Sequence, residues 1–312
     1  MEVRMLNYLV TGGAGFIGAA VAQKLIDEGS NVVVIDNLST GFFEKIPNEC
    51  VKIIGNSYDD EVIRLLDQYQ FDGIFHIAGQ SGGVTSYKDP IYDMRSNVES
   101  TIKLLQYCKE HKCNQFVFAS SMSVYGDQNP CPVSEDGEKN PTTYYAIGKL
   151  ASENYMKLYA SQFGINCVAL RLNNVYGPGQ NMDNLLQGMV SIFLAQAIKN
   201  KHIHVMGDKE RFRDFVYIDD VVDAFIRCMR ADIDGFEAYN VSTGTATTVE
   251  YLIEKIKGLL PFDVTVNYEG TTPGDQFGIY CDSSKLQNRL EWKPQTKLDE
   301  GLKQMVSWAL KG

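Results

Sequence analysis

Two adjacent tyrosines precede a lysine in the stretch TTYYAIGK, residues 142–149. On a helix, Tyr145 and Lys149 are four positions apart and share a face, whereas Tyr144 points about a quarter turn away. A fixed ammonium beside a phenol favours the phenolate, so this spacing predicts a tyrosine with a lowered pKa. The pair is therefore a candidate for proton transfer, with Tyr145 as the group that exchanges the proton.

A glycine-rich loop, VTGGAGFIG, places Gly12, Gly15 and Gly18 after a short apolar run and at the start of an amphipathic one. Glycines permit the tight turn and let backbone N–H groups approach a pyrophosphate at a helix N-terminus. Asp36 ends the next apolar run, where a carboxylate bonds the ribose hydroxyls of an adenosine. No arginine follows Asp36 closely to accept a 2′-phosphate, so the loop predicts NAD rather than NADP.

Short apolar runs alternate with amphipathic stretches through the first half of the chain, which predicts parallel strands separated by helices. Right-handed crossovers then give an α/β fold of the Rossmann type, a doubly wound parallel sheet with a smaller mixed α/β substrate lobe. The expected strands are 7–13, 31–37, 50–56, 71–79, 115–121 and 166–177, and the expected helices are 15–29, 59–69, 89–111 and 142–164. The second half is less regular, with helices expected at 184–200, 248–260 and 298–312, strands at 201–205 and 264–268, and a strand leading into a helix over 212–230.

The composition excludes several classes of function. A net charge of −10 argues against a nucleic-acid surface, which needs a basic footprint. No apolar run is long enough to span a bilayer and the first residues lack a signal-peptide pattern, so a cytoplasmic protein is expected. The seven cysteines and four histidines are scattered, which predicts neither a disulfide framework nor a metal site.

The glycine spacing, DNLSTG, SSMSVYG and the Tyr-x-x-x-Lys pair follow one another in an order that resembles the NAD-dependent epimerase/dehydratase family. This family belongs to the extended short-chain dehydrogenases/reductases and acts on nucleotide sugars, and the resemblance runs from about residue 7 to residue 309. It implies that Ser121, Tyr145 and Lys149 are catalytic, with Tyr144 a packing neighbour. The phenolate would take a proton from a sugar hydroxyl while the hydride on carbon moves to the nicotinamide.

The resemblance also assigns binding residues. Asn97 would steady a loop beside the cofactor, Asn56 would meet the adenine edge, and Lys149 would bind the nicotinamide ribose. The implied NAD-binding set is Gly12, Gly15, Phe16, Ile17, Gly18, Asp36, Asn37, Asn56, Ser57, Ile77, Ala78, Gly79, Asn97, Tyr145 and Lys149. The implied substrate-binding set is Ser121, Met122, Asn174, Asn184, Leu185, Arg213 and Asp275.

Within the substrate set, Asn174 and Arg213 match residues that contact the diphosphate, and Asp275 matches a position near the nucleotide ribose. Asn184 and Leu185 are expected to open a helix in the segment that covers the nucleotide. An arginine in isolation more often forms a surface ion pair, and Asp214 or Asp219 would be the partners of Arg213 in that alternative.

Two departures from the family pattern limit the chemistry. Dehydratases of the family carry an Asp-Glu pair after the catalytic Ser or Thr, and Met122 and Ser123 stand there instead. Cys131 and Cys167 do not match the extra acid-base residues of enzymes that epimerise carbons 3 and 5. Oxidation of one hydroxyl, at C4, remains, which favours a 4-epimerase; a 4-dehydrogenase, a 4-ketoreductase and a non-catalytic NAD-binding sensor are the alternatives.

The sequence leaves the nucleotide of the sugar substrate open. Relatives carry an arginine just before the motif PGD, whereas this chain has Thr271 and Thr272 ahead of Pro273. Compensation by Arg211 or Lys209, a changed pose of the substrate, and a less tightly bound diphosphate are the alternatives, and UDP-, GDP-, dTDP- and CDP-sugars all remain candidates.

The resemblance finally implies a domain division and a partner. Residues 1–172, joined by about 211–245, would form the NAD-binding domain, and 173–210 with 246–312 the nucleotide-sugar lobe. Relatives pair the helices that correspond to 92–111 and 143–163 in a four-helix bundle, so a homodimer is expected. Tyr155, Met156 and Tyr159 would lie on the contact face or, alternatively, in the core.

Overall fold

The computed structural model describes residues 4–128, 130–185, 187–270 and 277–311. Its central element is a parallel sheet in which seven strands from this part of the chain follow the order β11-β6-β5-β4-β1-β2-β3. The strands are β1 (Asn7–Thr11), β2 (Asn31–Asp36), β3 (Val51–Ile54), β4 (Gly73–His76), β5 (Gln115–Ser121), β6 (Asn166–Leu172) and β11 (Phe236–Val241). The chain order reverses between β1 and β4, which confirms the doubly wound Rossmann-type sheet.

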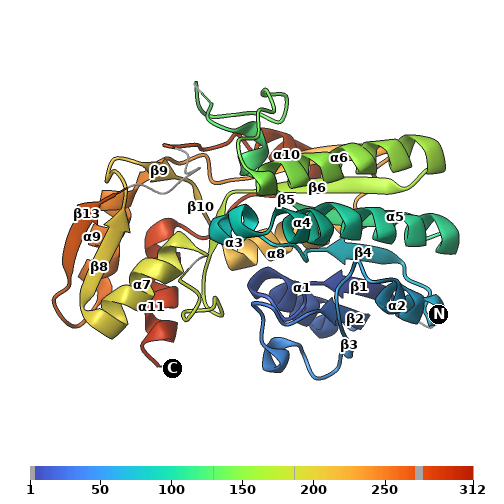
Figure 1. The fold of residues 1–312 in the computed structure, drawn as a ribbon, viewed down its shortest axis with the longest axis horizontal. Coiled ribbons are helices and arrows are strands. Elements are labelled where there is room, and N and C mark those ends of the chain that lie inside the picture. Colours follow the sequence, from blue (N-terminus) through green and yellow to red (C-terminus); the bar gives the residue numbers. More distant parts are fainter. Residues whose placement is uncertain (1–3, 129, 186, 271–276, 312) are drawn as a thin grey trace.

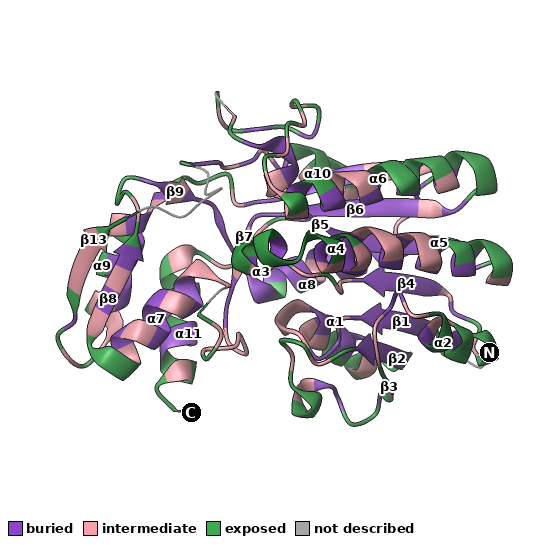
Figure 2. Ribbon diagram, in the orientation of Figure 1, coloured by how far each residue is buried: buried purple, intermediate pink, exposed green. Residues whose placement is uncertain are grey.

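Helices cover both faces of the sheet, and each face has its own apolar core (Figure 1). Helices α1 (Phe16–Asp27) and α8 (Ile218–Arg230) pack together on one face. On the other face lie α2 (Asp60–Arg64), α4 (Pro90–Met94), α5 (Ser100–His111) and α6 (Tyr144–Phe163), with the short α3 (Gly83–Lys88) beside them. Figure 2 shows the inner strands of the sheet buried and the outward faces of these helices exposed, as expected for a sheet between two helical layers.

The second lobe, on the left in Figure 1, is built around a small parallel sheet of β8 (His202–Met206) and β13 (Thr265–Glu269). Helices α7 (Met189–Asn200), α9 (Val249–Leu259) and α11 (Leu298–Ala309) accompany it, and α10 (Ser284–Leu290) packs on β11. Short ladders connect the lobes: β7 (Asn174–Tyr176) pairs with β10 (Phe215–Tyr217), and β9 (Phe212–Arg213) pairs with β12 (Thr247–Thr248).

The long helix expected over 89–111 is interrupted. Asp89 accepts a hydrogen bond from the N–H of Tyr92 at 2.9 Å and so caps α4, but a π-helical turn at Arg95–Glu99 then separates α4 from α5. Such turns insert one extra residue and redirect side chains, and they are frequent at functional sites. Apolar periodicity alone predicts a helix over the whole stretch and carries no signal for this turn.

Candidate active site

One cavity of about 1090 Å³ lies at the carboxyl ends of the central strands and is lined from both lobes. That edge of a doubly wound sheet, next to the reversal in strand order, is where ligands of such folds bind. Most predicted residues line it together: Gly12, Gly15, Phe16, Ile17, Gly18, Asp36, Asn37, Asn56, Ser57, Ile77, Ala78, Gly79, Ser121, Met122, Tyr145, Asn174, Asn184, Leu185 and Arg213. Asn97 and Lys149 lie buried behind this wall, and Asp275 falls outside the described residues.

The glycine loop leaves no room for side chains. Gly12 has a φ of 75°, and a Cβ there would lie 2.8 Å from the backbone nitrogen of Ala78. A Cβ on Gly18 would lie 2.1 Å from the carbonyl oxygen of Gly12, so only glycine lets α1 begin this close to β1. The first turn of α1 lines the cavity through Gly15, Phe16, Ile17 and Gly18, and the N-terminus of a helix binds a pyrophosphate well, which fits NAD.

Asp36 at the end of β2 is held by its neighbours. Its carboxylate accepts hydrogen bonds from the N–H of Ala14 at 3.0 Å and of Leu38 at 2.7 Å. Each carboxylate oxygen keeps a second acceptor site, which fits the hydroxyls of an adenosine ribose. Beside it, the amide of Asn37 donates to Asn56 at 2.8 Å, and Asn56 donates to Asp59 at 2.8 Å.

A buried histidine, which the sequence analysis missed, orders the loop after β4. The hydroxyl of Thr11 accepts from the N–H of Ile77 at 3.2 Å and of Ala78 at 3.1 Å, and it lies 2.7 Å from Nδ1 of His76. Burial, helped by the charge of Lys149, lowers the pKa of His76 to about 3, so the imidazole is neutral. Thr11 therefore donates to Nδ1 of His76, and this fixes the loop that lines the cofactor side of the cavity.

Ser121 and Tyr145 meet at the centre of the cavity. Thr143 caps α6 by accepting from the N–H of Ala146 at 3.2 Å, and this places Tyr145 in the first turn. The tyrosine hydroxyl contacts Ser121. Ser123 donates to the hydroxyl oxygen of Ser121 at 2.9 Å, so the Ser121 hydroxyl hydrogen is left to point at Tyr145. Met122 and Ser123 offer no carboxyl group here.

The prediction that the pKa of Tyr145 is lowered is wrong for the protein without bound ligands. Burial raises the pKa of Tyr145 to about 12, and the contact with Ser121 offsets only part of that rise. The ammonium nitrogen of Lys149 lies 5.6 Å from the centre of the Tyr145 ring and 4.6 Å from that of Phe118. Removal of water from the phenol, with the negative charge of Asp93, therefore sets the direction of the shift, which helix spacing alone does not reveal.

Asp93 is a second residue that the sequence analysis missed. Burial lowers the pKa of Lys149 to about 7, and the negative charge of Asp93 opposes that fall. Asp93 is itself buried and accepts from the side-chain amide of Gln80 at 3.0 Å. Asp93 lies four residues before Asn97, across the π-helical turn. This i, i+4 spacing was the sequence feature that could have indicated Asp93 as a residue of the site.

Asn97 holds the loop after β4 by hydrogen bonds. Its side-chain amide donates to the carbonyl of Gln80 at 2.9 Å and to that of Asp93 at 3.1 Å. A Cβ on Gly79 would lie 2.5 Å from Oδ1 of Asn97 and 3.0 Å from Nζ of Lys149, so glycine is required between them. Asn97 thus supports the cavity wall rather than lining the cavity.

The substrate side differs from expectation at one helix. Helix α7 begins at Met189, not at Asn184 and Leu185, because Gly188 adopts a φ of 84° and breaks the run. Asn184 and Leu185 therefore lie in the preceding loop, where the amide of Asn184 donates to Gln187 at 3.1 Å. Both still line the cavity.

That loop bridges the two lobes over the cavity. The amide of Gln187 donates to the hydroxyl of Ser81 at 2.6 Å, and Asn181 donates to the carbonyl of Thr40 at 3.3 Å. The ammonium of Lys45 donates to the carbonyl of Gly179. Loops from β2 and β4 are thereby joined to the substrate lobe, and no local sequence pattern predicts these contacts.

Two arginines bring positive charge to the substrate end. Arg213 is 4% exposed and donates to the carbonyls of Phe212 at 2.7 Å and Phe277 at 3.2 Å. Burial, with the nearby charge of Arg211, lowers the pKa of Arg213 to about 10. Arg211 also lines the cavity.

Asp214, one of the two alternative partners of Arg213, and Lys209, the other candidate cation, both make contacts elsewhere. The carboxylate of Asp214 accepts hydrogen bonds from Ser242, Thr243 and Gly244. Lys209 lies 2.7 Å from Glu250, away from the cavity lining. Arg211 is therefore the better placed of the two candidates to supply the charge that Thr272 lacks.

The described residues hold no cluster of histidine, cysteine or acidic side chains able to bind a metal ion. None of the helices found in the described ranges has the length and apolar character needed to cross a membrane.

Residues 8–242 match the model of the NAD dependent epimerase/dehydratase family. The UDP-glucose 4-epimerase of Mycolicibacterium smegmatis is 33% identical over 311 residues, which cover 97% of this chain and 98% of that protein. The solved UDP-glucose 4-epimerase of Thermotoga maritima with UDP-glucose superposes with a TM-score of 0.94 at 33% identity, over 98% of this chain and 99% of that one. The UDP-glucose 4-epimerase of Thermus thermophilus in complex with NAD gives a TM-score of 0.90 at 28% identity, over 97% and 98%.

Proposed function

This chain belongs to the NAD dependent epimerase/dehydratase family, and on that premise we propose that it inverts C4 of a UDP-hexose, as a UDP-glucose 4-epimerase does. It is an NAD-dependent enzyme of nucleotide-sugar metabolism. The observation that carries the proposal is the single cavity that Ser121, Tyr145, Asn174 and Arg213 line together, with further lining from the substrate lobe. The match along nearly the whole chain to enzymes named for UDP-sugars favours UDP over the other nucleotides that the sequence left open.

Each catalytic role follows from the position of the group. Tyr145 takes the proton of the C4 hydroxyl, and Ser121 donates its one hydroxyl hydrogen to the phenolate oxygen. The ammonium of Lys149 lies beside the ring of the phenol, and the negative charge of Asp93 favours the charged form of Lys149 against the effect of burial. NAD, held by the glycine loop and Asp36, would supply the acceptor for the hydride of C4 and would give it back to the opposite face of the ketone, so that the inversion has no net redox change.

The binding roles divide along the cavity. The glycine loop, Asp36, Asn37, Asn56, Ser57 and the segment Ile77–Gly79 are proposed to hold NAD. Met122, Asn174, Asn184, Leu185 and Arg213 are proposed to hold the nucleotide sugar. The NAD-binding domain is proposed to comprise 1–172 joined by about 211–245, which supply every strand of the central sheet, and the substrate lobe to comprise 173–210 and 246–312.

The deciding experiment offers the purified protein UDP-glucose, UDP-galactose and the corresponding GDP-, dTDP- and CDP-sugars. Products are followed by NMR and mass. Interconversion of the UDP-sugars at unchanged mass is the expected result. Loss of a hydrogen pair with accumulation of NADH would instead identify a 4-dehydrogenase, and loss of water would refute the interpretation of Met122 and Ser123.

We also propose a homodimer through α4, α5 and α6. These helices pack side by side, and their outer faces carry exposed apolar side chains, including Ile91 at 64% and Ile147 at 52% exposure. Tyr155 and Leu158 continue this face on α6, whereas Met156 is fully buried and belongs to the core. An apolar face of this kind is suited to a second copy of the same helices.

A further inference from the structure

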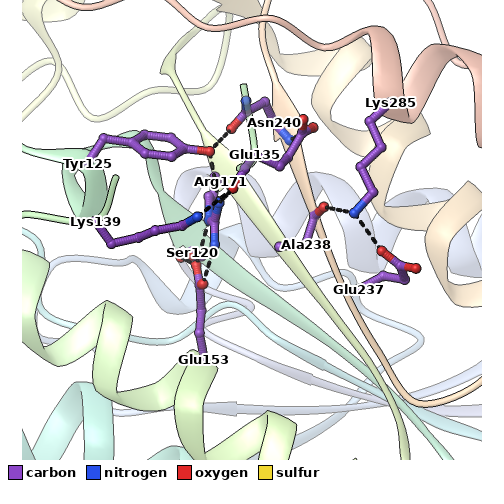
Figure 3. Close-up of polar contacts among 10 residues, drawn as sticks. All are labelled: Ser120, Tyr125, Glu135, Lys139, Glu153, Arg171, Glu237, Ala238, Asn240 and Lys285. Carbon is purple, nitrogen blue, oxygen red and sulfur yellow. Dashed lines mark hydrogen bonds and ion pairs between the residues drawn. The ribbon is translucent and has the colours of Figure 1, made fainter. Parts of the chain in front are cut away.

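A buried ion pair joins Glu153 on α6 to Arg171 on β6 (Figure 3). Arg171 donates from Nε to Glu153 Oε1 at 3.0 Å and from Nη2 to Glu153 Oε2 at 2.7 Å. The side chains of Glu153 and Arg171 are 0% and 2% exposed. An apolar pair of the same size is often at least as stable as a buried ion pair, so the presence of this pair is weak evidence for a role in stability.

The remaining contacts of the pair lead to other elements of the site. The hydroxyl of Ser120 donates to Glu153 Oε1 at 2.6 Å, and Arg171 Nη1 donates to the hydroxyl of Tyr125 at 2.9 Å. Tyr125 in turn donates to Asn240 at 2.6 Å. Arg171 also donates to the carbonyl of Glu135 at 3.0 Å. We call Ser120, Tyr125, Glu135, Glu153, Arg171 and Asn240 the Glu153 network.

This network meets the chain on both sides of Ser121. Ser120 is the preceding residue on β5, and Tyr125 ends the 3₁₀ turn that follows Ser121. On α6, Tyr145, Lys149 and Glu153 are spaced by four residues and share one face, so Glu153 is the inner end of the face that bears the proposed proton acceptor. A slide or rotation of α6 against β5 would stretch the Ser120–Glu153 bond and the Ser121–Tyr145 contact together.

We propose that Glu153 is a positioning residue that, through Ser120 and Arg171, sets the register of Tyr145 against Ser121. Hydrogen bonds have a preferred direction, so the network holds β5, α6 and β6 in one position relative to one another. Apolar packing alone would allow these elements to slide. The inference rests on the proposed roles of Ser121 and Tyr145, and it assigns no contact with substrate to Glu153.

Ser120→Ala removes one hydrogen bond of the network and leaves the ion pair intact. We expect kcat for UDP-sugar epimerisation to fall by about 10- to 100-fold, as small misplacements of reacting groups do, with KM within about twofold of wild type. The contact with Ser121 lowers the pKa of Tyr145, so its loosening raises that pKa. The pH below which kcat falls should therefore move upward, a change that a merely structural role would not produce.

Ser161→Ala is the matched control, because its hydroxyl also lies on α6 but donates at 3.0 Å to the carbonyl of Leu158 near the exposed end. It should leave kcat and the pH profile unchanged. Tyr125→Phe tests the network from the other side of Ser121 while keeping the volume of the ring, and should act in the direction of Ser120→Ala. If both network variants keep the wild-type kcat and pH profile while losing thermal stability, the proposal is overturned.

A crystal structure of the Ser120→Ala variant separates this proposal from the proposed function. A Tyr145 hydroxyl displaced from Ser121 relative to wild type supports the positioning role even if no UDP-sugar is turned over. An unmoved Tyr145 contradicts the positioning role even if the wild-type protein is a fast epimerase.

Discussion

At the scale of single residues, Tyr144 and Tyr145 provide an internal comparison. They are adjacent, yet Tyr145 lines the cavity against Ser121 whereas Tyr144 is 47% exposed and stacks edge-on against Tyr87. Tyr145→Phe should lower kcat by about 10²- to 10⁴-fold, the usual contribution of a positioned acid-base group. Tyr144→Phe should retain wild-type turnover, and thermal unfolding of both variants should match wild type because neither loses ring volume. Equal activity of the two variants would remove Tyr145 from the mechanism.

The charge of Lys149 links the site to stability. Its pKa falls from 10.5 in the unfolded chain to about 7 in the folded protein, because the ammonium is buried. Between these values the unfolded chain binds more protons, so the free energy of unfolding should rise with pH across this window. Below pH 7 Lys149 is protonated in both the folded and the unfolded state. The full cost of burying its ammonium then lowers the free energy of unfolding, by an amount on the order of a few kcal/mol.

Lys149→Met should therefore stabilise the protein relative to wild type most strongly near pH 6, and the difference should shrink toward pH 10. Unfolding temperatures measured across this range check the trend, with the exposed Lys303→Met as the control that shows no such dependence. The same variant should lose epimerase activity. A stability difference that does not change with pH would mean that Lys149 keeps an ordinary pKa when folded.

At the scale of secondary-structure elements, the junction of β1 with α1 is the most demanding. A Cβ on Gly18 would overlap the carbonyl of Gly12 at 2.1 Å, so Gly18→Ala must push α1 away from the loop that faces the cofactor. NAD affinity, measured by calorimetric titration, should fall below detection, and the unfolding temperature should drop.

Gly258→Ala in α9 is the matched control, because no atom lies within 4 Å of its added Cβ. This variant should keep NAD binding and stabilise the helix by about 0.5–1 kcal/mol. Wild-type NAD affinity in Gly18→Ala would refute the close approach of loop and helix.

Elements with a strong local signal were predictable from the sequence, and contacts between distant segments were not. The apolar runs at β1, β2 and β5 and the glycine loop follow from periodicity and turn chemistry. The π-helical turn at Arg95–Glu99 and the late start of α7 depend on tertiary contacts and on one glycine conformation, so periodicity extends both helices too far.

The same limit applies to the candidate site. Tyr145 and Lys149 are separated by a fixed helical spacing, which predicts their common face but not how far burial excludes water from them. Asp93, His76 and the loop around Gln187 enter the site from segments far apart in the chain, and their roles became visible only once the sheet brought these segments together.

At the scale of the whole molecule, α6 divides its surface between two tasks. Its inner face bears Tyr145, Lys149 and Glu153, while Ile147 and Leu158 lie on the outer face and are 52% and 46% exposed. A dimer formed through the outer face would restrain the same helix that the Glu153 network holds from within. Association and catalysis are then coupled through the placement of one helix.

Leu158→Glu tests this coupling, because a carboxylate buried at the centre of an apolar interface cannot be paired there. We expect light scattering to show a dimer for wild type and a monomer for the variant, with a lowered kcat as α6 loses its outer support. Leu310→Glu is the matched control: Leu310 is 43% exposed but follows α11 in the other lobe, so this variant should remain dimeric and active. A dimeric Leu158→Glu protein would place the contact between subunits elsewhere, and a fully active monomer would show that the inner contacts of α6 suffice to hold Tyr145 in register.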